Sequence, residues 1–181
     1  WNSDNSSFIA KDSSKNIFYL YKTSDLSKIF NITASFANLK KNSPIKKISF
    51  HPADPDKMII QTRNGLEIFD SARIKTETVS AAGVISWAID NPNVYSVKKI
   101  ENATSTNGGP VYGIYSFNLI IKSETKLYEF SEKDEFDPNG NPEILAKGKT
   151  IIISGKENIF FFNSETKEMK KNADGADMIS V

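Results

Sequence analysis

The chain has 181 residues, a length for which one domain is the expected number. Its 23 Lys and Arg balance 22 Asp and Glu, so a formal charge of +1 argues against a polyanionic partner such as nucleic acid. The chain has no cysteine, which excludes disulfides, cysteine-bound metals and thiol nucleophiles. A single histidine, His51, excludes histidine-rich metal sites. Every apolar run is far shorter than the roughly 18 residues of a membrane helix, so we expect no membrane contact within this sequence.

Short runs of β-branched and aromatic residues between turn residues predict an all-β chain, beginning with a unit at residues 1–43. This first unit has strand patterns at 7–11 and 16–22. Residues 24–41 fit either an outer strand or a helix with Ser24-Asp25 as its N-cap.

The second unit, residues 44–82, has the clearest pattern. Its Asn64-Gly65 pair is the strongest hairpin signal in the chain, because a tight primed turn requires positive φ values that Asn and Gly tolerate. Four strands are predicted, at residues 45–50, 57–62, 66–70 and 75–79.

The same order of strands recurs in units at 83–142 and 143–177. In the third unit, residues 101–110 and 132–142 are polar and indicate surface insertions. Met178 to Val181 repeats an Ile-Ser junction and is expected to start or close a blade. The predicted strands of these two units are 84–89, 94–100, 111–122, 126–130, 143–146, 150–154, 159–163 and 167–171.

Four-stranded units that recur about every 40 to 45 residues are typical of β-propeller blades. The junctions Ile48-Ser49-Phe50 and Ile85-Ser86-Trp87 occupy the same place in consecutive units. We therefore predict a single all-β domain over residues 1–181. It is a β-propeller of about four four-stranded blades, or an arc of a larger propeller.

Two sets of neighbouring carboxylates are candidates for catalysis. Asp54 with Asp56, or Glu132 with Asp134 and Glu135, fits the pair that a glycosidase needs. Acidic residues so close together near turns more often form a solvated edge. His51, the one available imidazole base, follows Phe50 at a strand exit and is expected to be a turn residue.

Other motifs also favour structural explanations. Residues 137–143 alternate oxygen ligands as a calcium loop does, but Pro142 and Gly148 replace the Gly and Glu of an EF-hand. The glycine-rich residues 107–110 fit a hairpin tip, and Phe160 to Phe162 fits a core strand. Two basic pairs, expected to protect a sheet edge, are Lys40, Lys41, Lys46 and Lys47. We therefore predict no catalytic residue, no metal site and no cofactor.

The segments Trp1 to Ala10 and Ile48 to Pro52 resemble the blade junctions of bacterial WD-like propellers, including the Tol-Pal system propeller. Asn64 to Asp70, with the bias towards Ile, Lys and Asn, looks closest to the propeller region of PEGA-domain proteins. This resemblance implies an extracytoplasmic propeller, membrane-anchored in the full-length protein, that binds or scaffolds. Its motifs are structural and supply no catalytic residue.

The expected function is a non-catalytic protein-interaction or scaffold module of the cell envelope, with an unidentified protein partner. Self-association through blade edges is a further expectation. The alternative is a propeller enzyme or lectin acting on cell-envelope carbohydrate, with carboxylates from the loops after Phe50, Trp87 and Phe130.

Overall fold

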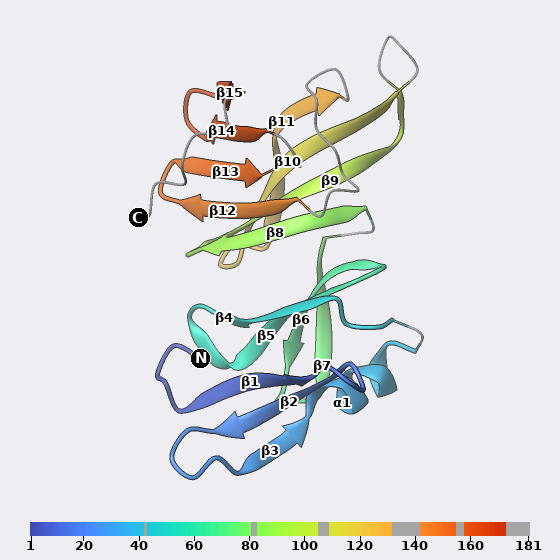
Figure 1. Cartoon of the computed structure of the whole chain (residues 1–181), viewed down its shortest axis with the longest axis vertical. Coiled ribbons are helices and arrows are strands. Elements are labelled where there is room, and N and C mark those ends of the chain that lie inside the picture. The colour runs from blue at the N-terminus through green and yellow to red at the C-terminus, as the bar shows by residue number, and fades with distance from the viewer. Residues whose placement is uncertain (42, 81–82, 105–108, 132–141, 155–157, 173–181) are drawn as a thin grey trace. The chain divides into compact units, whose positions relative to one another are not determined.

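The computed structural model describes residues 1–41, 43–80, 83–104, 109–131, 142–154 and 158–172 (Figure 1). In these residues the chain forms four antiparallel sheets and one short helix, which confirms the all-β prediction. It divides into two compact units, 1–82 and 83–181, each holding two sheets. The four sheets lie within the four predicted repeats. None of the described helices is long and apolar enough to cross a membrane.

The first sheet has three strands in the order β1-β2-β3, followed by a helix. Both structures considered for residues 24–41 are present, because a strand runs directly into the helix at Asn31. The bounds are β1 (Ser7–Asp12), β2 (Ile17–Lys22), β3 (Lys28–Asn31) and α1 (Ile32–Leu39).

The predicted N-cap at Ser24-Asp25 is wrong. Pairing of Tyr19 with Asn31 keeps the chain extended up to Asn31, so the helix starts later than expected. Asn31 is the N-cap, and its side-chain oxygen accepts a hydrogen bond from the Ala34 N–H at 2.9 Å. Asp25 instead accepts the Ser27 N–H and orders the turn between β2 and β3.

The second sheet has the order β4-β5-β6-β7. Thr62 pairs with Gly65, so the hairpin loop between β5 and β6 consists of Arg63 and Asn64. The hairpin prediction is confirmed, but only Gly65 of the expected pair has a positive φ, of 125°. The bounds are β4 (Lys47–His51), β5 (Asp54–Thr62), β6 (Gly65–Asp70) and β7 (Lys75–Ser80).

One hydrophobic core joins the two sheets of the first unit to the helix. Phe36 of α1 meets Phe69 of β6 edge-on, with ring centroids 6.1 Å apart, and Phe30 of β3 stacks on the same ring. Each buried aromatic or aliphatic side chain contributes about 1.5–3 kcal/mol. This core holds the turns of both sheets in fixed relative positions.

The third sheet, in the second unit, has the order β11-β10-β9-β8. Three predicted bounds of this sheet are wrong by three or more residues: β10 ends at Asn118 instead of continuing to residue 122, β9 extends to Thr104 into the expected insertion, and β11 begins at Ser123 instead of residue 126. Residues 105–108 and 132–141 lie outside the described residues. The bounds are β8 (Val84–Asp90), β9 (Asn93–Thr104), β10 (Pro110–Asn118) and β11 (Ser123–Ser131).

The fourth sheet has the order β12-β13-β14-β15 and shares a core with the third. Phe160 and Phe162 are 3% and 1% exposed, as predicted for a core strand, whereas Phe161 points to the opposite face and is 38% exposed. The predicted final strand at Met178 to Val181 lies outside the described residues. The bounds are β12 (Glu143–Lys147), β13 (Thr150–Ser154), β14 (Ile159–Asn163) and β15 (Met169–Asn172).

Candidate functional site

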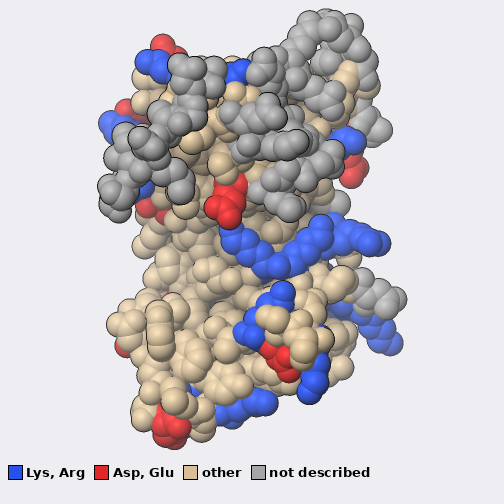
Figure 2. Space-filling model, viewed as in Figure 1, with Lys and Arg blue, Asp and Glu red and all other residues tan. Residues whose placement is uncertain are grey.

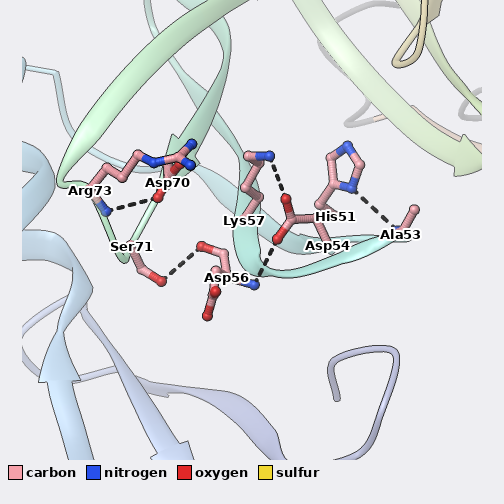
Figure 3. Close-up of polar contacts among 8 residues, drawn as sticks. All are labelled: His51, Ala53, Asp54, Asp56, Lys57, Asp70, Ser71 and Arg73. Carbon is pink, nitrogen blue, oxygen red and sulfur yellow. Dashed lines mark hydrogen bonds and ion pairs between the residues drawn. The ribbon is translucent and has the colours of Figure 1, made fainter.

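The turn between β4 and β5 brings His51 close to Asp54 and Lys57 (Figure 3). His51 Nδ1 accepts a hydrogen bond from the Ala53 N–H at 3.2 Å. Burial lowers the pKa of His51, nearby Asp54 raises it and Lys57 lowers it further. The lowered pKa favours the neutral imidazole, whose Nδ1 can accept the Ala53 N–H within the turn.

Each of the two aspartates on this turn has a different environment. The Asp54 carboxylate pairs with Lys57, accepts the Asp56 N–H at 3.1 Å, and has a lowered pKa chiefly because of the Lys57 hydrogen bond. The Asp56 backbone carbonyl accepts two bonds from Ser71, from its N–H at 2.9 Å and its hydroxyl at 2.8 Å. The Asp56 carboxylate points away from the other labelled side chains (Figure 3).

Ser71 belongs to the turn between β6 and β7, so these bonds fasten two turns of the second sheet together. Asp70 orders that second turn by accepting the Arg73 N–H at 2.9 Å, and its carboxylate also pairs with the Arg73 guanidinium at 3.4 Å. Asp54 and Asp56, for which the sequence favours a solvated edge over a catalytic pair, therefore belong to a hydrogen-bonded rim of two turns in which Asp54 is neutralised by a lysine.

An open pocket of about 420 Å³ lies in the first unit, between this rim and the first sheet. One wall carries Asp4 and Ser6, and the opposite wall carries Asp56 and Ser71. The Ser6 N–H donates to Asp4 at 2.9 Å, and hydrogen bonds from Ser6 lower the pKa of Asp4. The pocket thus presents ordered oxygen atoms on both walls.

A second feature is a turn that recurs between the third and fourth strands of the sheets. Asn118 Oδ1 accepts the N–H groups of Ile120 and Ile121 at 2.9 and 3.1 Å, and the Lys122 N–H returns to the Asn118 carbonyl at 2.9 Å. Lys122 has a φ of 55°. This geometry holds the side chains of Ile120 and Ile121 outwards, 75% and 71% exposed.

Sequence reasoning missed these two isoleucines, because an apolar β-branched run predicts a strand. The signal that would have located them is the Phe117-Asn118 pair, which repeats Phe162-Asn163 and parallels Phe69-Asp70 at the ends of the corresponding strands. Asn at the end of a strand accepts N–H groups two and three residues later and so begins a turn.

The remaining candidates take structural roles or lie outside the described residues. Asp90, the last residue of β8, accepts the Gly148 N–H at 2.7 Å. Lys40 pairs with the buried Glu67 at 3.3 Å. Residues outside the description include Glu132, Asp134, Glu135, most of the 137–143 loop and Asn107-Gly108. The described ranges contain no group of three or more His, Cys, Asp or Glu that could hold a metal ion.

On the face drawn in Figure 2, Lys and Arg side chains stand beside Asp and Glu, with broad uncharged areas between them.

No protein-family model matches the chain, and no curated protein matches it. Solved structures do match, at identities that show the fold alone. An oligogalacturonate lyase in complex with manganese superposes with a TM-score of 0.63 at 12% identity, over 94% of this chain and 50% of that one. A second oligogalacturonate lyase, from Vibrio parahaemolyticus, gives 0.64 at 9% identity with the same two coverages. TolB from Acinetobacter baumannii gives 0.53 at 14% identity, over 91% of this chain and 40% of that one.

These neighbours are propeller-like folds and confirm the predicted fold class. The chain spans about half the length of the two lyases. The neighbours include enzymes as well as proteins without catalytic activity. These comparisons do not show a relationship to PEGA-domain proteins.

Proposed function

We propose that this chain is a non-catalytic protein-binding module built from propeller blades, and that the Ile120–Ile121 turn is one of its contact points. The observation that carries the proposal is the exposure of these two adjacent isoleucines at a rigid turn. Burying a fully exposed isoleucine side chain against a partner yields about 1.5–3 kcal/mol. Burial of this exposed apolar pair against a partner would therefore favour binding.

The polar side chains on the rim formed by the β4–β5 and β6–β7 turns also favour binding over catalysis. His51 accepts a backbone N–H, Asp54 pairs with Lys57, and the Ser71 hydroxyl donates to a backbone carbonyl. A hydrolytic site of the Ser–His type needs a nucleophile hydrogen-bonded to its base, and these three contacts serve the turns instead.

The resemblance of the blade junctions to bacterial WD-like propellers supports a place in the cell envelope, as part of an anchored protein. A scaffold of this kind can also bind through the unpaired edge strands of its sheets. β1 is the edge strand of a three-stranded sheet, so self-association through that edge is part of the proposal.

Site-specific photo-crosslinking in cells of the source organism tests the proposal. A photo-reactive residue at position 121 is compared with one at position 166, which occupies the same place in the β14–β15 turn but lies beside Glu165. We expect a discrete crosslinked protein from position 121, lost when the neighbouring residue is also changed in an Ile120→Glu variant. Equal crosslinking from both positions, or none from position 121, would contradict the proposal.

The Ile120→Glu variant must remain folded for this comparison to count. Because the Ile120 side chain is exposed, we expect its free energy of unfolding to stay within about 0.5 kcal/mol of the parent chain. Urea unfolding followed by the fluorescence of buried Trp87 measures this.

The alternative function is a carbohydrate-binding or carbohydrate-cleaving module. Two oligogalacturonate lyases among the similar structures and the oxygen-lined pocket in the first unit favour it. Cleavage of, or saturable binding to, cell-envelope glycans by the intact chain would support this alternative and displace the proposal if position 121 also fails to crosslink.

A further inference from the structure

We infer that the pocket of about 420 Å³ in the first unit accepts a lysine or arginine side chain from a protein partner. This inference rests on the proposed function in taking the ligand to be part of a protein. It concerns a different surface from the Ile120–Ile121 turn, so the two can fail separately.

The walls of the pocket carry uncompensated negative charge. Asp4 is exposed and, like an ordinary aspartate, is a carboxylate at neutral pH; hydrogen bonds from Ser6 lower its pKa further. Within the described residues, the Asp56 carboxylate has no hydrogen-bond or ion-pair partner, although its backbone is held by Asp54 and Ser71. None of the described lining residues is a lysine or arginine, so the pocket itself supplies no counter-charge.

Part of the pocket lining is apolar. It consists of Leu20, which is 7% exposed, the half-buried Phe30, and Ile29, which is 43% exposed. Phe30 also stacks on Phe69, with ring centroids 6.1 Å apart. These three residues offer a surface to hydrocarbon groups, whereas the polar lining residues offer oxygen atoms.

A lining that combines apolar residues with two carboxylates matches one kind of side chain. Lysine and arginine have long hydrocarbon stems that pack on apolar surface, with a cationic end that stays hydrated or pairs with carboxylates. An acidic side chain would be repelled by Asp4 and Asp56, and a purely aliphatic one would leave both carboxylates unpaired.

A smaller pocket of the same unit gives a contrast. It has a volume of about 260 Å³ and is lined by aromatic and aliphatic residues together with Lys11, whose ammonium lies 5.5 Å from the centre of the Phe18 ring. This pocket already contains a cation, so it offers no comparable attraction for another. Selectivity for a cation is thus expected at the larger pocket.

The test is a titration of the intact 15N-labelled chain with three blocked tripeptides, Gly-Lys-Gly, Gly-Arg-Gly and Gly-norleucine-Gly. Norleucine keeps the lysine stem but lacks the ammonium group. We expect the two cationic peptides to shift the Ser6 and Ser71 amide signals in a saturable, salt-sensitive way, and norleucine to bind about fivefold more weakly. A larger response to lysine or to arginine identifies the preferred side chain.

Two variants locate the effect. Asp4→Asn with Asp56→Asn removes both charges while asparagine can still accept the Ser6 N–H, so we expect about fivefold weaker binding of the cationic peptides. Asp12→Asn is the matched control, because Asp12 is an aspartate outside the pocket that accepts the Ser14 N–H in a similar turn. It should bind like the parent chain.

Three outcomes would overturn the inference: equal binding of norleucine and lysine, an equal loss in Asp12→Asn, or shifts confined to residues outside the pocket. Shifts of Ser6 and Ser71 produced by neutral oligosaccharides but not by the cationic peptides would also overturn it. Crosslinking from position 121 would remain unaffected by any of these results, so the proposed function is judged independently.

Discussion

The turns β10–β11 and β14–β15 share one backbone hydrogen-bond pattern but carry different side chains, apolar in the first and polar in the second. Each follows a buried phenylalanine and an asparagine whose Oδ1 accepts two N–H groups, and each ends in a lysine with positive φ. Between asparagine and lysine one turn carries exposed Ile120-Ile121 and the other carries Glu165-Thr166. The backbone of this turn does not require isoleucine, and the proposed contact with a protein partner would explain the apolar tip.

The buried phenylalanines are expected to give the largest effect on stability. Phe162 is 1% exposed and packs against Tyr128 at 5.4 Å, so Phe162→Ala should lower the free energy of unfolding by about 3–5 kcal/mol. Replacing Phe117, which is 6% exposed, by alanine should lower the free energy of unfolding by a smaller amount. Urea unfolding measures both. Phe161→Ala is the control on the exposed face and should cost about 1 kcal/mol; an equal loss there would contradict the assigned orientation of β14.

The asparagines should come next, and they test whether the two turns share one design. Asn118→Ala and Asn163→Ala each leave two backbone N–H groups without their acceptor, so each should cost about 1–2 kcal/mol. Aspartate at either position keeps the acceptor and should restore most of the stability. Thermal unfolding of the four variants measures this, and a cost at only one turn would break the comparison.

The smallest of these effects is expected at the lysine that ends the β14–β15 turn. Lys167 has a φ of 61°, a conformation that costs an L residue roughly 1–2 kcal/mol. Glycine avoids this cost but loses more backbone entropy, so Lys167→Gly should stabilise the chain by about 0.5–1 kcal/mol. Lys170→Gly, in the extended strand β15, should have the opposite sign. Chemical denaturation measures both, and destabilisation by Lys167→Gly would refute the assigned backbone conformation.

Local sequence patterns located most strands because apolar alternation and turn residues act over a few positions. The hairpin near Asn64-Gly65 and the buried Phe160 and Phe162 were predicted on that basis and are confirmed. The same rules failed at Ile120 and Ile121, since composition cannot distinguish a buried apolar run from an exposed one. They also placed the helix N-cap at Ser24-Asp25, although strand pairing extends the chain to Asn31.

The sequence by itself determined the all-β class, the repeated blade pattern and the exclusion of cysteine chemistry, because these depend on residue type and spacing. Tertiary structure alone decided what surrounds Asp56. Asp54 meets Lys57, three residues later in its own turn, whereas Asp56 lines a pocket to which the start of the chain also contributes. The surroundings of Asp56 arise from packing between two sheets, and spacing along one sheet carries no information about them.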